Sequence, residues 1–145
     1  MNSYQYNGLN DRLQETVNGS TTTFTMDLNA GLTQALSDGT NTYLYGNGRI
    51  AQVNTTTEYF LNDALGSVRQ LTSSSGAVTY ARTYDPYGVV TSTSGASQSA
   101  FAYTGEYWGD STELLYLRAR QYSPSIGRFL TSDPSKIDAN LVTTQ

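Results

Sequence analysis

The sequence predicts an all-β protein, built from successive antiparallel β-hairpins that form a curved or spiralling sheet with little helix. Its composition favours this fold, because 12 Tyr and many Thr suit strands while 13 Gly and many Asn suit tight turns. Turn dipeptides such as Asn-Gly separate short runs in which apolar and polar residues alternate. A loose repeat of about twenty residues also runs through the first ninety positions, as a series of similar hairpins requires.

Strands and turns are predicted for each hairpin. Half-buried strands are expected in 21–28, 41–46 and 76–83, and in the last of these Val78, Tyr80 and Arg82 are expected to share one face. Type I′ turns, in which both central residues have positive φ, are predicted at Asn7-Gly8, Asn18-Gly19 and Asn47-Gly48. Further turns are predicted at Asp38-Gly39, Ser75-Gly76 and Ser94-Gly95.

The repeat unit reads strand, tight turn, strand. Each copy begins with an aromatic residue, reaches Asn, Asp or Gly, and resumes with an apolar residue after the turn. The turn positions, which are 17 to 22 residues apart, are Asn7, Asp27, Gly46, Asp63 and Asp85. An ordinary β-sandwich or barrel whose spacing is coincidental is the alternative architecture.

The stretch LLYLRARQY (114–122) is predicted to be one strand, because its residues alternate between two faces. One face would carry Leu115, Leu117 and Ala119, and the other Tyr116, Arg118, Arg120 and Tyr122. A helix with Asp110 as its N-cap and Glu113 at its third position is the competing prediction. The stretch SPSIGRF (123–129) is then expected to be a tight reversal between two strands.

Composition also restricts function. The chain has no His and no Cys, which removes the usual general base, thiolate chemistry and most zinc sites, so acid–base chemistry would fall to carboxylates. With a net charge of −4 and scattered Arg residues there is no basic stripe, which argues against a nucleic-acid partner. Acidic residues do not cluster as in calcium loops, and no apolar run reaches the roughly 18 residues of a membrane span. No metal, cofactor or membrane span is therefore expected.

Two longer stretches resemble a known family. FLNDALGSVRQLTSSSGAVTYARTYDPYGVV (60–90) and FAYTGEYWGDSTELLYLRARQYSPSIGRFLTSDP (101–134) are similar to the RHS (rearrangement hotspot) repeat-associated core, and the looser repeats before them are similar to YD repeats. The second stretch is the more specific, because its FAYTGEY opening, LLYLRARQY run and GRFLTSDP close stand in the family's order and spacing. The resemblance divides the chain into YD-type repeats (1–58), a core-like segment (59–134) and a tail (135–145).

The resemblance implies a shell. In RHS proteins, the C components of bacterial Tc toxins and the teneurins, YD hairpins wind into a spiralling sheet that can close around a polypeptide cargo, and the core plugs its end. In toxin-delivering members the core is an aspartyl autoprotease, which implies a carboxylate role for Asp133, with Arg120 and Arg128 orienting nearby groups. No second Asp-Pro follows Asp133-Pro134 here, so the motif is incomplete and a turn or cap role for Asp133 is the preferred alternative. No enzymatic activity is expected from this chain.

The repeat signature is expected to serve turns rather than chemistry. In the turn Tyr84-Asp85-Pro86-Tyr87-Gly88, the proline would preset φ and the glycine would take the strained position. The other signature positions are Gly105, Gly127, Asp133 and Pro134. Trp108 and the many Tyr residues are expected to pack between hairpins, with stacking on glycans as the alternative.

The expected function is structural. A short repeat chain has open sheet edges, so its expected partners are copies of itself or other YD-repeat segments, joined by strand addition into an extracellular fibre or cell-surface assembly. One alternative is the terminal segment of an RHS or Tc-type toxin-encapsulating shell with a degenerate autoprotease. The other is a glycan-binding surface adhesin. The expected location is extracellular or at the cell surface, although no signal peptide opens the chain.

Overall fold

A computed structural model describes residues 2–9 and 11–132 and confirms the all-β fold. These residues form fifteen strands and two short 3-10 helices, and they contain no α-helix. No helix in this part of the chain has the length and apolar character needed to cross a membrane.

The strands lie in three antiparallel sheets in which neighbours in sequence are neighbours in space. Sheet A contains β1 (Ser3–Tyr6), β2 (Arg12–Val17) and β3 (Ser20–Thr23). Sheet B contains β4 (Thr25–Asp27), β5 (Gln34–Ser37), β6 (Thr42–Gly46), β7 (Gly48–Val53), β8 (Thr57–Asn62), β9 (Val68–Ser73), β10 (Val78–Tyr84) and β11 (Val90–Gly95). Sheet C contains β12 (Tyr107–Gly109), β13 (Leu114–Leu117), β14 (Arg120–Ser123) and β15 (Arg128–Phe129). The short helices are η1 (Tyr103–Gly105) and η2 (Pro124–Ile126).

Sheets A and B form one curved wall, residues 3–95. Only Phe24 separates β3 from β4, and its N–H donates to the carbonyl of Leu13 at 2.8 Å. The Phe24 ring is buried and packs edge-on against Tyr107, with ring centroids 5.2 Å apart. The chain therefore turns a corner at Phe24, and this corner joins the two sheets.

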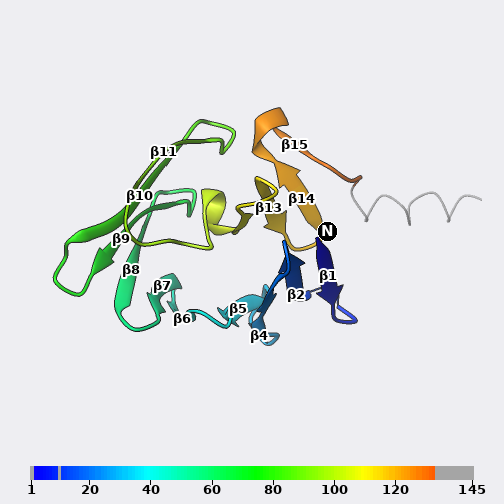
Figure 1. The fold of residues 1–145 in the computed structure, drawn as a ribbon, viewed down its shortest axis with the longest axis horizontal. Coiled ribbons are helices and arrows are strands. Elements are labelled where there is room, and N and C mark those ends of the chain that lie inside the picture. Colours follow the sequence, from blue (N-terminus) through cyan, green and yellow to red (C-terminus); the bar gives the residue numbers. More distant parts are fainter. Residues whose placement is uncertain (1, 10, 133–145) are drawn as a thin grey trace, which may run out of the picture.

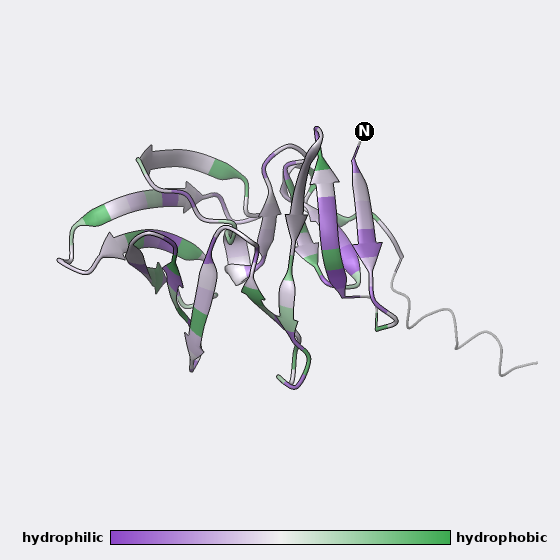
Figure 2. Cartoon of the chain, turned by 60° about the horizontal axis from the view of Figure 1, so that its bottom comes forward, coloured by the Kyte–Doolittle hydropathy of each residue, from purple (hydrophilic) through white to green (hydrophobic). Residues whose placement is uncertain are grey.

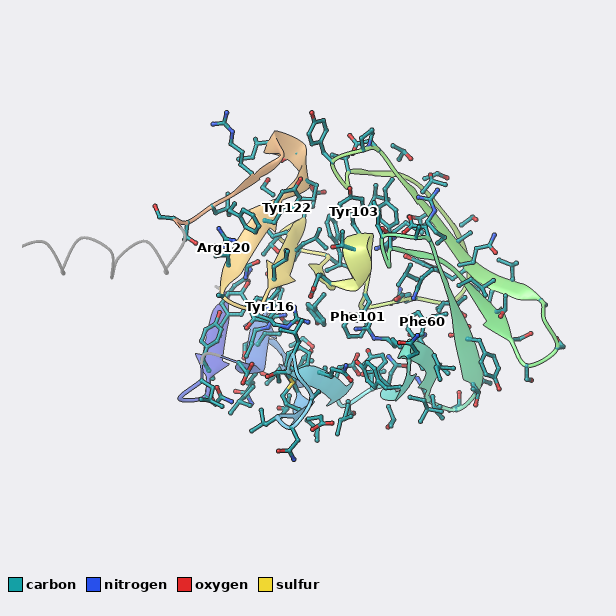
Figure 3. All side chains as sticks on the ribbon, turned by 180° about the vertical axis from the view of Figure 1, so that it is seen from behind. Phe60, Phe101, Tyr103, Tyr116, Arg120 and Tyr122 are labelled. Carbon is teal, nitrogen blue, oxygen red and sulfur yellow. The ribbon has the colours of Figure 1, made fainter. Side chains whose placement is uncertain are left out.

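The remainder, called the inner segment (residues 96–132), lies on the concave side of the wall. Figure 1 shows sheet B curving around η1, with sheet C standing across the open side. Phe101 of this segment belongs to the same buried cluster as Phe60 of the wall, and Figure 3 shows the two close together. The other buried members of the cluster are Tyr43, Val68, Leu71 and Tyr80. The hydrophobic core thus lies between the wall and the inner segment.

The predicted turns are confirmed in part. Asn18 and Gly19 have φ values of 51° and 83°, as a type I′ turn requires. Asn7-Gly8 and Asn47-Gly48 were predicted wrongly as type I′ turns, because neither asparagine has a positive φ. Gly39 and Gly76 lie in turns with positive φ, whereas Ser94-Gly95 ends β11 instead of forming a separate turn.

The prediction of one strand over LLYLRARQY is wrong. The stretch is a hairpin in which β13 and β14 pair, and Leu117 lies opposite Arg120. Arg118 adopts φ 54° in the turn, and its guanidinium forms an ion pair with Glu106 at 3.0 Å. The competing helix from Asp110 is absent too, since residues 110–113 form a turn between β12 and β13. The reversal predicted over 123–129 is confirmed by η2.

A bulge corrects the predicted face of β10. The register shifts between Val78 and Tyr80, so these two residues do not share a face. Val78 is 55% exposed, whereas Tyr80 is 2% exposed and belongs to the core. Arg82 follows Tyr80 on the inner side, with its Cζ 5.2 Å from the Tyr80 ring centroid.

Candidate functional site: the junction of wall and inner segment

Three turns of the wall share one geometry. They are called the YD turns here and comprise residues 7–11, 63–67 and 85–89. In the third, Asp85 Oδ1 accepts the backbone N–H groups of Tyr87 at 2.8 Å and Val89 at 2.9 Å. The N–H of Asp85 donates to the carbonyl of Val89, and the N–H of Gly88 donates to the carbonyl of Asp85. The carboxylate therefore caps its own turn.

The other two YD turns repeat this arrangement. Asp63 Oδ1 accepts the N–H groups two and four residues later, at 3.0 and 2.9 Å, and Asn7 Oδ1 accepts the equivalent pair, both at 2.9 Å. Asn replaces Asp because the turn needs only an oxygen acceptor. Of the other predicted turn positions, Asp27 accepts one such bond, from Asn29, and Gly46 has no side chain to accept any.

The inner segment holds the third YD turn through two tyrosines. The Tyr103 hydroxyl donates to the carbonyl of Pro86 at 2.8 Å, and the Tyr122 hydroxyl donates to the carbonyl of Tyr87 at 2.9 Å. Figure 3 shows both tyrosines on the same side of the molecule. Gly88 has φ 94°, and a Cβ atom there would lie 2.6 Å from Cδ1 of Tyr103. This position therefore requires glycine both for its backbone and for the ring packed on it.

The second YD turn docks against η1. The N–H of Thr104 donates to Oγ of Ser67 at 3.0 Å. Gly105, with φ 72°, approaches so closely that a Cβ atom would lie 2.9 Å from the carbonyl oxygen of Gly66. The close approach of these two backbones fixes η1 on the wall.

Next to the first YD turn, Arg12 enters an aromatic cage of the inner segment. The Arg12 Cζ lies 4.1 Å from the ring centroid of Tyr116 and 4.6 Å from that of Tyr107. The backbone N–H of Arg12 donates to the Tyr116 hydroxyl at 3.2 Å. Its guanidinium pairs with Glu15 at 3.1 Å, while the Tyr107 hydroxyl donates to the same carboxylate at 2.6 Å. Burial, and then the bond to Glu15, raises the pKa of Tyr107.

Arg49 makes the matching contact from sheet B. Its Cζ lies 3.1 Å from the ring centroid of Phe101, and one of its N–H groups donates to the carbonyl of Gly105 at 3.1 Å. A second N–H donates to the Tyr45 hydroxyl at 3.3 Å. Burial lowers the pKa of the Arg49 guanidinium. Two wall arginines thus lie among aromatic rings to which both the wall and the inner segment contribute.

The signature residues gather at this junction. Asp85, Pro86 and Gly88 lie in the third YD turn, and Tyr84 ends β10 directly before it. Gly127 meets the same turn, because a Cβ atom there would lie 3.1 Å from the Tyr87 ring. Gly105 contacts the second YD turn instead.

The predicted catalytic residues are only partly described. Asp133 and Pro134 lie outside the described residues. Arg120 places its Cζ 3.8 Å from the ring centroid of Phe129, and Arg128 stands opposite Ser123 on the exposed strand β15. The autoprotease prediction therefore stays a prediction.

The chemistry of the junction is that of docking. Glu15 and Glu106 are each paired with an arginine, and within the described ranges no three His, Cys, Asp or Glu side chains are grouped to hold a metal ion. Trp108 is half-buried and lines an open cavity of about 320 Å³ together with Tyr4 and Asp110. The contacts of Tyr103, Thr104 and Tyr122 hold backbone segments of the wall in place.

Comparison with known proteins gives the family. Residues 32–145 match the model of the teneurin YD-shell. The chain belongs to the teneurin YD-shell family. The tRNA3(Ser)-specific nuclease WapA of Bacillus spizizenii is 32% identical over an alignment of 142 residues, which covers 91% of this chain and 6% of that protein. The double-stranded DNA deaminase toxin A of Burkholderia cenocepacia is 33% identical over 81 residues, which are 52% of this chain and 6% of that protein.

Solved structures share the YD-shell fold. The crystal structure of TcdB2-TccC3 superposes with a TM-score of 0.68 and 22% identity, over 92% of this chain and 8% of that one. The resemblance to RHS and Tc-type proteins is therefore confirmed. The chain spans only about 6% of the length of the WapA relatives that it matches.

Sequence reasoning missed several junction residues. Asp63 and Gly66 have the spacing of Asp85 and Gly88, which was a usable signal for a second docked turn. Arg12 and Arg49 carried no signal, because single arginines in alternating strands normally face solvent. Tyr103 was one of many tyrosines, and its role depends on a contact with a turn far away in the sequence.

Proposed function

We propose that this chain is an end module of a YD-repeat shell, in which the wall forms part of the shell and the inner segment closes it. The observation that supports this most is the junction: the inner segment contacts all three YD turns or the residue beside them. Tyr116 reaches Arg12 next to the first, Thr104 reaches the second, and Tyr103 reaches the third. A segment that locks onto successive repeats suits closure of a repeat array, whose end must be capped.

The closed inner face has a consequence for cargo. The inner segment occupies the concave side of this part of the wall, so a polypeptide cargo would lie beyond it, in the shell formed by further repeats. Under this proposal the nuclease and deaminase activities named for the relatives belong to the rest of those proteins. The chain itself acts as a structural part, and its partners are other YD-repeat segments.

Hydrogen exchange on the 145-residue chain tests the docking. We expect slow exchange in the second and third YD turns, because their backbone N–H groups are bonded within the turn and residues of η1 contact both turns. Tyr103→Ala should accelerate exchange in 85–89 and leave exchange in β6 unchanged. Tyr59→Ala on the opposite face should leave exchange in 85–89 unchanged as well. Equal exchange in the two variants would show that Tyr103 does not hold the turn.

A chimera tests closure. In the tRNA nuclease WapA of Bacillus subtilis, the matching 142 residues would be replaced by this chain. We expect the chimera to resist protease as its parent does, and Gly88→Val to remove that resistance while Gly76→Val preserves it. If the Gly88→Val chimera resists protease as well as the Gly76→Val chimera does, the proposal that the junction closes a shell is contradicted.

Strand addition between copies is the second candidate function. Five of the six residues of β11 are exposed, and β11 forms one edge of sheet B. An exposed edge offers free backbone N–H and C=O groups to another strand. Negative-stain electron microscopy of the purified chain would show filaments under this hypothesis, and uniform small particles would rule it out.

A further inference from the structure

A small cavity between the wall and the inner segment is lined by three arginines. Its volume is about 70 Å³. Arg12 comes from sheet A, Arg49 from sheet B, and Arg118 from the turn of the β13–β14 hairpin. Figure 2 shows strongly hydrophilic residues in the strands beside the N-terminus, and β2 buries two of its charged residues, Arg12 and Glu15. Cationic side chains from all three sheets therefore meet at one cavity.

Contacts with the lining place the two wall guanidinium groups at this cavity. The Arg12 Cζ lies 4.1 Å from the ring centroid of Tyr116, and the Arg49 Cζ lies 3.1 Å from that of Phe101. Both rings line the cavity, and Figure 3 shows them on the residues that it labels. Aromatic and aliphatic surroundings lower the local dielectric, so the charges act more strongly there than in water.

Positive charge exceeds negative charge around the cavity. Glu106 lines it and pairs with Arg118 at 3.0 Å, while Glu15 pairs with Arg12 at 3.1 Å. Within residues 2–9 and 11–132, Arg49 forms no ion pair with a carboxylate, and its N–H groups donate to neutral oxygens instead. A buried cation is stable only when its charge is compensated. One positive charge at the cavity thus still needs a counter-charge.

Two N–H donors of these arginines are also unused. The Nε atoms of Arg12 and Arg118 are buried and have no hydrogen-bond acceptor in the described part of the chain. Arg12 as a whole is only 4% exposed. A buried N–H without an acceptor costs free energy, and a guanidinium offers donors only. A negatively charged acceptor would satisfy the donors and the charge together.

We propose that this cavity binds a small inorganic anion of the size of chloride. Sites for larger organic ligands start at about 300 Å³, well above the volume available here. The anion would lie between Arg12 and Arg49 of the wall and Arg118 of the inner segment, so it would help to join the two parts. The site does not depend on the shell proposed above, because all three arginines belong to this chain.

Thermal unfolding in two salts tests the proposal. The 145-residue chain is melted in sodium chloride and in sodium gluconate at equal ionic strength, since the gluconate ion is too large for the cavity. We expect a melting temperature about 3–6 °C higher in chloride, because an anion that binds only the folded chain stabilises it by mass action. Arg49→Met should abolish this difference. The matched control Arg82→Met removes an inner-side arginine outside the cavity lining and should preserve it.

Bromide diffraction locates the ion without any variant. Bromide has the charge of chloride and scatters anomalously, so crystals of the wild-type chain grown in sodium bromide should show a peak between the three guanidinium groups. Equal melting temperatures of the wild type in chloride and gluconate overturn the proposal, and so does the absence of the bromide peak. A peak without stabilisation by chloride would be an adventitious ion only, which overturns the proposal as well.

Discussion

The two sides of sheet B differ in a way that explains the molecule. The inner side carries arginines and a glutamate, yet it is the covered side, while Leu44, Tyr59 and Leu61 stand exposed on the outer side. The inner segment supplies partners to two of these charges, the ring of Phe101 and the carbonyl of Gly105 to Arg49 and the hydroxyl of Ser97 to Glu58, whereas Arg82 packs on Tyr80 of the wall. The wall's inner side therefore binds the inner segment through specific hydrogen bonds and ring contacts, in addition to excluding water.

The largest effect is expected from breaking the buried ion pair. Arg12→Met leaves Glu15 without its cation, and both side chains are at most 10% exposed. We expect a loss of about 3–5 kcal/mol in the free energy of unfolding, measured by urea denaturation. The double variant Arg12→Met, Glu15→Gln should recover part of this loss. A loss below about 1 kcal/mol for the single variant would place the pair with ordinary surface ion pairs.

A matched leucine pair compares the two sides directly. Leu71 is 0% exposed on the inner side, whereas Leu61 is 46% exposed on the outer side. We expect Leu71→Ala to destabilise the chain by about 2–5 kcal/mol, because it leaves a cavity in the core. Leu61→Ala should change stability by less than about 1 kcal/mol in urea denaturation of the dilute chain. Similar losses for both variants would contradict the assignment of the two faces.

A matched glycine pair isolates the ring that covers the third YD turn. Gly88 and Gly76 both have positive φ, at 94° and 82°, but only Gly88 has Tyr103 packed on it. Gly76→Ala should lower the free energy of unfolding by about 1–2 kcal/mol through backbone strain alone. Gly88→Ala should lower it by about 2–4 kcal/mol, because the methyl group also displaces the ring. Thermal unfolding of both variants checks the difference.

The smallest effect concerns Glu58, on the inner side. Burial alone would raise its pKa, but hydrogen bonds from Ser97 and Gln52 lower it. A lowered pKa in the folded state contributes stability that is present above the unfolded pKa of about 4.3 and is lost as pH falls below it. We expect Glu58→Gln to melt at most about 2 °C below the wild type at neutral pH, since the carboxylate is partly exposed. The two melting temperatures should converge in acid, and a constant gap would exclude the titration of Glu58 as its cause.

The sequence was sufficient for the all-β fold class and for some of the turns, but not for every strand or for the assembly of the sheets. The turn at Asp85 could be predicted, because Asp, Pro and Gly each have a stated role in a turn of that length. The hairpin within 114–122 could not, because Arg118 takes the left-handed conformation without a Gly or Asn to indicate it. The contact of Arg12 with Tyr116 joins residues 104 positions apart, and no local pattern encodes such a partner.

The self-capping YD turns set an order of folding. Each closes through bonds between residues no more than four positions apart, so a wall hairpin can form as soon as its own residues are available. The inner segment follows the wall in the chain and reaches back across long sequence separations, whose loop-closure entropy delays its contacts. During synthesis from the N-terminus, the wall would thus be assembled hairpin by hairpin before the inner segment arrives. The segment synthesised after the wall is then also the segment that joins its hairpins across long sequence separations.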